Sequence, residues 1–170
     1  TQCVGERVLR DGRVDSALID AEQFAAHGLS WAATYVEALR QMLGWAGRLQ
    51  GAGNFGELEQ LILQSAYGEY LAQLYGGIAL SQVEIVRPRD MGLTSKDTHA
   101  FFTDGVKKLI EGGNTNAARM RIAALIADGA DSGYFGHVGL DDEMLEMVRD
   151  QFRRFVSEQV LPEAHAWHLK

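Results

Sequence analysis

Apolar residues recur every three or four positions along most of the chain, the spacing that places side chains on one face of an α-helix. This period predicts helices over residues 16–49 and 57–86, two shorter helices between residues 95 and 126, and a last helix that begins near residue 141. Only residues 3–14 carry a β signal, because two short valine-containing runs flank Asp11-Gly12, a dipeptide suited to a tight hairpin turn. An irregular arm is an equally good interpretation of that segment, since a lone hairpin is marginal. The fold class is therefore predicted to be all-α.

The first predicted helix places its apolar residues on one stripe, with charged side chains opposite. Asp15-Ser16 supplies a cap for its start, Gly28 marks an expected break or kink, and the loop Gly51–Gly56 ends it. The stripe consists of Ala32, Tyr35, Val36, Leu39, Met42, Leu43 and Ala46.

The second predicted helix is apolar on two sides, which is normal for a helix that lies between neighbours. Close approach by another helix would explain Gly68, Gly76 and Gly77, each of which lowers helix stability by up to about 1 kcal/mol relative to alanine. Pro88 closes the segment. One side carries Leu63, Tyr67, Tyr70, Leu74 and Ile78, and the other carries Leu58, Leu61 and Ile62.

Two shorter helices complete a predicted bundle of about four. Ser95 or Asp97 can cap the first, which ends at Gly112-Gly113, and Asn114 or Thr115 can cap the second. The apolar stripes are Phe102, Val106, Leu109 and Ile110 in the first, and Ala118, Ile122, Leu125 and Ile126 in the second.

A glycine-rich linker over residues 129–140 is predicted to separate a helical extension, residues 1–128, from a further helical segment, residues 141–170. Asp141, Asp142 and Glu143 crowd the first turn of the last helix, where carboxylates can cap free amides. Pro162 must kink or stop that helix near Leu161. Its apolar face consists of Leu145, Val148, Phe152, Phe155, Val156 and Val160.

Residues 141–170 resemble the opening helix of the N-terminal domain of flavin-dependent acyl-CoA dehydrogenases. In that family a basic amphipathic helix runs into a hydrophobic-x-Pro-x-Ala segment and an aromatic residue. The matching positions here are Phe155-Val156, the run Val160–Ala164 and Trp167. The ending His165–Lys170 and the long extension resemble one subgroup of the family. His168 fits that subgroup better than the family average, because many members carry an acidic residue at this position.

The resemblance implies that the intact protein oxidises a CoA thioester between its α and β carbons. In the family a carboxylate takes the α-proton, N5 of FAD accepts a hydride, and an electron-transferring flavoprotein removes the electrons. The catalytic glutamate and most FAD contacts of the family lie in later domains, so no catalytic, cofactor-binding or metal-binding residue is assigned here. The extension would be architectural, in a homo-oligomer. The alternative is a free-standing helical interaction module without catalytic activity.

Several local patterns suggest chemistry, and each has a plainer interpretation that we favour. Gly51–Gly56 spells G-x-G-x-x-G, but a dinucleotide site needs a preceding strand, so a turn between antiparallel helices is expected. His165 and His168, with Glu163, lack the further ligand that a zinc site needs. Five aromatic residues could stack on a flavin, but core packing is expected for them: Trp31, Trp45, Tyr67, Tyr70 and Tyr75. The arginine pairs Arg87/Arg89 and Arg153/Arg154 could contact CoA phosphates, but solvated surface is expected for them.

Composition places the chain among ordinary globular proteins, with 46% hydrophobic and 23% charged residues. A net charge of −7 argues against a general binder of nucleic acid or anionic membrane, since both attract basic surfaces. A single cysteine, Cys3, favours a reducing compartment, and a cytoplasmic location is expected.

Overall fold

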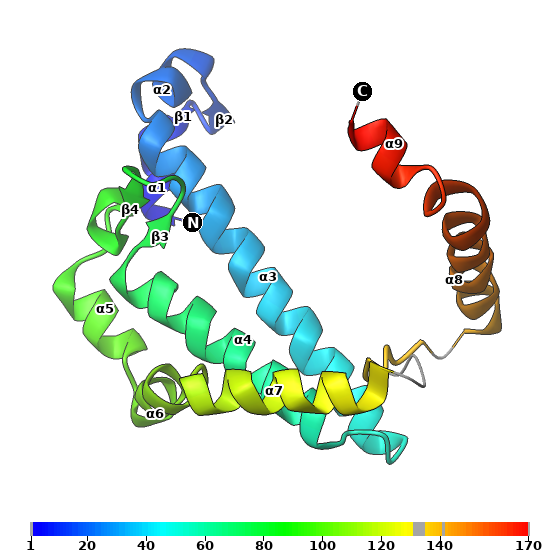
Figure 1. Cartoon of the computed structure of the whole chain (residues 1–170). Helices are drawn as coiled ribbons and strands as arrows, with labels where there is room; N and C mark the ends of the chain where they lie inside the picture. Colours follow the sequence, from blue (N-terminus) through cyan, green and yellow to red (C-terminus); the bar gives the residue numbers. More distant parts are fainter. Residues whose placement is uncertain (1, 131–134, 141, 170) are drawn as a thin grey trace. The chain divides into compact units, whose positions relative to one another are not determined.

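The computed structural model describes residues 2–130, 135–140 and 142–169. The chain divides into two compact units, Thr1–His137 and Val138–Lys170, and each is described by itself. Helices make up most of both units, and the strands of the described residues form two short hairpins (Figure 1). The prediction of an all-α fold is confirmed.

The first unit opens with helix α1, Gln2–Val8, followed by the antiparallel strands β1, Leu9–Arg10, and β2, Arg13–Val14. The hairpin turn lies at Asp11-Gly12, as predicted, and both residues have positive φ, 52° and 74°. The prediction of a strand before Leu9 is wrong. Val4 and Val8 are four residues apart and both are buried, so this run forms a helix with one inward face.

Helices α2, Ser16–Ala21, and α3, Gln23–Gly51, replace the single helix predicted over residues 16–49. Asp15 caps α2 by accepting the Leu18 N–H at 3.0 Å, but the break falls at Glu22 and not at Gly28. Gly28 lies inside unbroken α3, where a Cβ would overlap the side chain of Val86. The glycine is therefore a packing contact and not a helix breaker.

Helix α4, Glu57–Gly76, packs against three helices: α3, α6 and α7. This confirms that it is sandwiched. Its predicted end at Val86 is wrong, because the chain leaves the helix at Gly77, which has φ 137°, and forms the antiparallel strands β3, Ile78–Ala79, and β4, Ile85–Val86. Ile78 and Val86 are 1% and 0% exposed, so this hairpin is part of the core.

A short 3₁₀ helix, η1 (Pro88–Met91), leads into three further helices: α5, Ser95–Phe101, α6, Asp104–Gly112, and α7, Asn116–Gly129. The single helix predicted before Gly112-Gly113 is divided at Phe102, because Thr103 begins a new helix by accepting the Val106 N–H. Thr94, and not Ser95 or Asp97, caps α5. Thr115 caps α7, as one of the two predicted alternatives.

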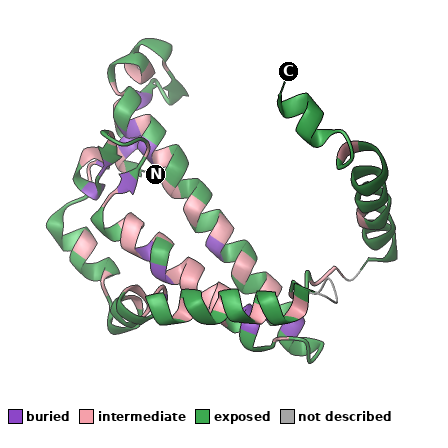
Figure 2. Ribbon diagram, viewed as in Figure 1, coloured by how far each residue is buried: buried purple, intermediate pink, exposed green. Residues whose placement is uncertain are grey.

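The main core cluster lies where α1, α3, the second hairpin and η1 meet, and it contains Val4, Ala25, Val86 and Met91 (Figure 2). Part of the apolar stripe predicted for α3 is buried, including Leu39 and Ala46. Val36 and Leu43 from the same stripe are instead 57% and 59% exposed.

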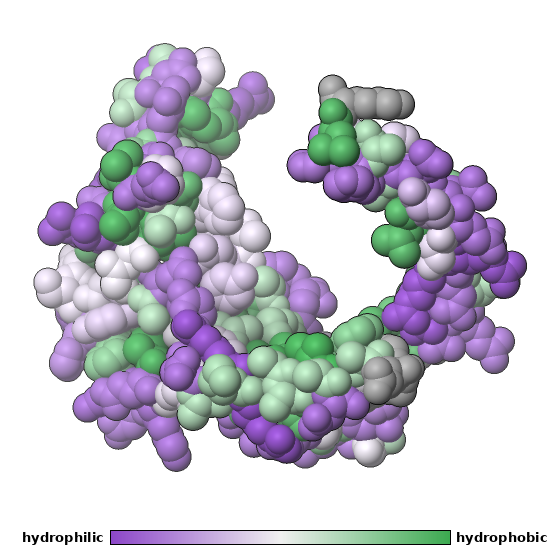
Figure 3. Space-filling view, in the orientation of Figure 1, coloured by the Kyte–Doolittle hydropathy of each residue, from purple (hydrophilic) through white to green (hydrophobic). Residues whose placement is uncertain are grey.

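The second unit contains α8, Glu143–Phe155, the π-helical segment η3, Val156–Val160, and α9, Ala164–His168. Asp142 caps α8 by accepting the Met144 N–H at 2.8 Å, while Asp141 lies outside the described residues. The helical run formed by α8 and η3 ends before Pro162, as predicted. Hydrophobic side chains lie on the surface of this unit (Figure 3), and those of α8 and η3 that are exposed include Leu145, Val148, Phe152, Phe155 and Val156.

None of the helices in the described ranges is long and apolar enough to cross a membrane.

Gly68→Ala should destabilise the chain by about 1–3 kcal/mol, the usual cost of overpacking. A Cβ at residue 68 would lie 2.8 Å from the Asn114 nitrogen and 2.8 Å from the Leu109 oxygen, and backbone atoms cannot rotate away. Gly47→Ala is the matched control in α3, where a Cβ meets nothing within 4 Å, and it should stabilise by about 0.5–1 kcal/mol. Urea unfolding of both variants measures the difference, and equal effects would contradict the packing described for α4.

Candidate functional site

The turn between α3 and α4 holds a buried carboxylate. Glu59, in the first turn of α4, is 1% exposed. Its Oε2 accepts the N–H of Gly56 at 3.1 Å, and its Oε1 accepts the N–H of His137 at 2.7 Å. One side chain thus joins the start of α4 to a segment 78 residues later in the chain.

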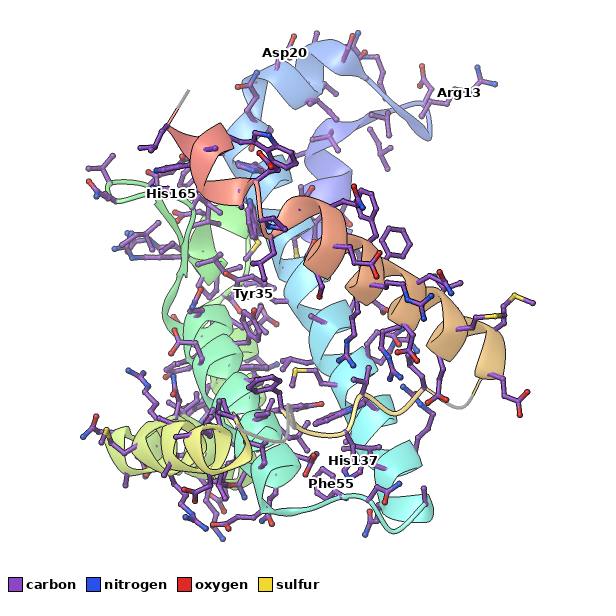
Figure 4. The ribbon with its side chains drawn as sticks, turned by 45° about the vertical axis from the view of Figure 1, so that its right-hand side comes forward. Arg13, Asp20, Tyr35, Phe55, His137 and His165 are labelled. Carbon is purple, nitrogen blue, oxygen red and sulfur yellow. The ribbon has the colours of Figure 1, made fainter. Side chains whose placement is uncertain are left out.

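Trp45 and Phe55 complete this site, which we call the Glu59 clasp (Glu59, Gly56, Trp45, Phe55 and His137). The indole Nε1 of Trp45 donates to the carbonyl oxygen of His137 at 3.0 Å, and its ring meets Phe55 edge to face, with centroids 6.3 Å apart. Phe55 and His137 lie at the same end of the first unit (Figure 4). The segment that follows α7 is therefore held through both its amide and its carbonyl.

Gly136 makes the close approach of this segment to Glu59 feasible. Its φ is +96°, a conformation that side chains with a Cβ rarely adopt, and an added Cβ would lie 3.2 Å from Oε1 of Glu59. Glycine at this position is thus favoured by the backbone angle, and it also avoids a tight contact with the carboxylate.

Burial of a carboxylate is costly unless hydrogen bonds replace its water. The two backbone donors provide such bonds, and hydrogen bonds to an ionised acceptor are stronger than neutral ones. Glu59 also lies in the first turn of a 20-residue helix, where the helix dipole favours negative charge. Because both oxygens accept backbone hydrogens and the residue is shielded from solvent, this carboxylate suits an anchor and not an acid–base catalyst.

The sequence prediction missed the Glu59 clasp. The available signal was the spacing of Gly56 and Glu59, which matches the x-x-Glu part of a capping box with glycine in place of serine or threonine. Nothing in the local sequence indicates the second partner, because His137 belongs to the segment predicted as a linker. Residues 131–134 of that linker lie outside the described residues.

The glycine-rich run Gly51–Gly56 connects the end of α3 to the start of α4, which confirms the prediction of a turn between two helices. Gly53 has φ +73°, which closes the turn. A dinucleotide site of this motif needs a strand that aims the turn at a pyrophosphate, and here the preceding element is a 29-residue helix.

The aromatic residues pack largely against one another and against backbone. Tyr35 and Tyr70 have ring centroids 4.5 Å apart, and the Tyr67 hydroxyl donates to the Leu39 carbonyl oxygen at 2.9 Å. Burial raises the pKa of Tyr67, and burial beside Tyr70 and Glu69 raises the pKa of Tyr35.

Two of the aromatic residues predicted to be core are partly exposed. Trp31 and Tyr75 are each 39% exposed; Trp31 donates to His27, and Tyr75 stacks on Phe102 with centroids 4.3 Å apart.

The remaining candidates belong to other elements of the chain. His165 and His168 lie on α9, with Glu163 just before it, and the described residues contain no group of three or more potential metal ligands. Arg153 and Arg154 are exposed in the last turn of α8. Arg87 and Arg89 flank the first residue of η1 and line a surface hollow.

No protein-family model matches the chain. Over 165 residues it is 55% identical to (2S)-methylsuccinyl-CoA dehydrogenase of Cereibacter sphaeroides. This chain is a relative of that dehydrogenase. The aligned region covers 97% of the chain, so the resemblance to acyl-CoA dehydrogenases inferred from residues 141–170 is confirmed and extends to the helical bundle before them. The chain spans 29% of the length of methylsuccinyl-CoA dehydrogenase.

Glu59→Ala should destabilise the chain by about 2–6 kcal/mol, because two part-buried amides lose a charged acceptor, at about 1–3 kcal/mol each. Glu111→Ala is the control: its side chain is 65% exposed and 3.9 Å from Lys107, so its effect should stay within about 0.5 kcal/mol. Urea unfolding gives both values, and hydrogen exchange should show lost protection at the His137 amide only in Glu59→Ala. Retained protection there would contradict the anchoring role.

An ion pair between α4 and α7 gives a prediction for pH. Arg121 donates twice to Glu57, at 2.8 and 2.6 Å, which lowers the pKa of the Glu57 carboxyl below its ordinary value. Because the Glu57 pKa is lowered in the folded state, the ion pair stabilises the fold at pH values above the ordinary carboxyl pKa. This stabilisation is lost as the pH falls through the lowered pKa. Arg121→Gln should raise the Glu57 pKa toward its ordinary range in a carboxyl NMR titration. Arg119→Gln, which removes a donor to Asn114 instead, should leave the Glu57 pKa unchanged.

Proposed function

We propose that this chain is the N-terminal part of a longer acyl-CoA dehydrogenase that oxidises (2S)-methylsuccinyl-CoA to mesaconyl-CoA. The 55% identity to the relative of that name carries the proposal. Because the aligned region is 29% of the relative, the remaining 71% of its length is available for the catalytic domains. The reaction removes two hydrogen atoms between the α and β carbons of the thioester. The proposed electron acceptor is FAD, held by residues outside this chain.

The proposed role of this segment is architectural. Residues 1–128 would form a helical extension, residues 129–140 a linker, and residues 141–170 the start of the N-terminal α domain of the dehydrogenase. The Glu59 clasp supports this role, because it fastens the chain just after α7 through two hydrogen bonds to His137. The exposed apolar residues of α8 support it as well, since an apolar face about 100° wide is typical of a helix that packs on a core.

Partners and location follow from the same proposal. The whole protein would bind an acyl-CoA, pass electrons to an electron-transferring flavoprotein, assemble as a homo-oligomer and act in the cytoplasm. The acidic net charge of the chain agrees with a partner other than nucleic acid or an anionic membrane.

The whole protein, purified with its cofactor, should lose flavin absorbance when (2S)-methylsuccinyl-CoA is added, because oxidation of the thioester reduces the flavin. The (2R) isomer is the control, and it should cause little or no change. The 170-residue chain alone should purify without flavin and oxidise neither isomer.

A whole protein that lacks flavin, or a reading frame that stops shortly after residue 170, would contradict the proposal and favour the free-standing interaction module. Oxidation of an acyl-CoA by the 170-residue chain alone would contradict the placement of the active site.

A further inference from the structure

Helix α7 is apolar on two opposite sides. Ala118, Ile122 and Leu125 recur at helical spacing and are half-buried, and the helix packs on α4. The opposite side is also apolar but exposed, with Met120 64% exposed, and Figure 3 shows hydrophobic residues gathered over α7. A helix that is apolar on both sides is normally covered on both sides. We call the exposed side the α7 face, and it consists of Ala117, Met120, Ala123, Ala124 and Ala127.

Two residues of opposite charge flank the α7 face along the same edge. Arg121 and Asp128 are about two helical turns apart, so their side chains leave the helix in nearly the same direction. Arg121 donates to Glu57 through Nε and Nη2, and its Nη1 makes no hydrogen bond within the described residues. Asp128 has no ion pair within 4.0 Å in the part of the chain that the structure describes. A partner surface can therefore offer an anion to Arg121 and a cation to Asp128.

An antiparallel copy of α7 supplies both charges. In a two-fold contact, residue i of one copy meets residue j of the other, and j meets i in return. If two α7 helices run in opposite directions, Arg121 of each copy reaches Asp128 of the other, and the two-fold axis passes near Ala124. Met120 of each copy then lies near Ala127 of the other, so a long side chain meets a short one. A parallel copy would bring like charges together instead.

We propose that the α7 face binds a second copy of this chain, with the two helices antiparallel and Arg121 of each copy paired with Asp128 of the other. The expectation of a homo-oligomer rests on the proposed function, whereas the surface and the orientation come from α7 itself. The alanines let the two helix axes approach to about 8–10 Å. A stable interface usually contains about 20–30 residues a side, so the α7 face is one contact within a larger assembly and not a complete interface.

The test is disulfide formation between copies of the whole protein that carry Ala124→Cys and Cys3→Ser, the second change removing the thiol of Cys3. Mild oxidation should join residue 124 of one copy to residue 124 of another, because the two-fold axis passes beside it. Mass spectrometry of the proteolysed protein identifies this peptide, which only two copies can produce. Gly47→Cys on α3 is the matched control: a Cβ there meets nothing within 4 Å, and residue 47 should not link to itself.

Charge reversal tests the orientation in the same assay. Arg121→Glu alone, or Asp128→Lys alone, should lower the yield of the link at residue 124 about fivefold or more, because two attractive contacts become two like-charge contacts. Co-expression of the two variants should restore the link between unlike copies, since both contacts then join opposite charges. Arg119→Glu is the control for this step. It lies on the other edge of α7, and its co-expression with Asp128→Lys should restore nothing.

The proposal is overturned if residue 124 does not link to itself, if residue 47 links equally well, or if co-expression restores nothing. Residue 124 that forms no link and resists a thiol reagent in the whole protein would show that another part of the dehydrogenase covers the α7 face. The assay is independent of flavin reduction. A whole protein that oxidises methylsuccinyl-CoA but forms no link at residue 124 therefore defeats this proposal alone.

Discussion

The close approach of α4 to the junction of α6 and α7 determines how the first unit is built. The Cα of Gly68 lies near the backbone of Gly113 and Asn114, where a Cβ has no room. The Ser65 hydroxyl donates to the carbonyl oxygen of Gly113 at 3.3 Å, and the Asn114 amide donates to Glu69 at 2.8 Å. Backbone and polar groups thus meet directly, so the position of α7 relative to α4 is fixed to within small shifts.

The Glu59 clasp depends on that geometry. With α7 held against α4, the chain leaves α7 beside the turn that joins α3 to α4, and Glu59 and Trp45 reach its amide and carbonyl. A buried carboxylate there stabilises the unit only if both donors are in place, because removal of one leaves a poorly solvated charge.

Sequence periodicity predicted the helices well where the apolar stripe and the end signals agree. Thr115 and Pro162 mark the start of α7 and the end of the last long helix, because a hydroxyl cap and a missing amide act locally. The second hairpin was missed since Leu74 and Ile78 keep helical spacing past the true end at Gly77. There the positive φ of one glycine and the burial of Ile78 and Val86 override the period.

The Glu59 clasp was harder to predict, because its partners lie far apart in the sequence. Glu59 is an ordinary helix-start residue until His137 is placed beside it. Arg87 and Arg89 are exposed, as predicted for solvated surface. The resemblance of residues 141–170 to acyl-CoA dehydrogenases was readable because its residues are contiguous.

We propose that a helical extension precedes a helix which the rest of a longer dehydrogenase completes. Hydrogen exchange over residues 142–161, compared between the 170-residue chain and the whole protein, tests it most directly. We expect weak protection in the chain and strong protection in the whole protein, while protection of α4 stays the same in both. Equal protection of residues 142–161 in the two proteins would contradict it.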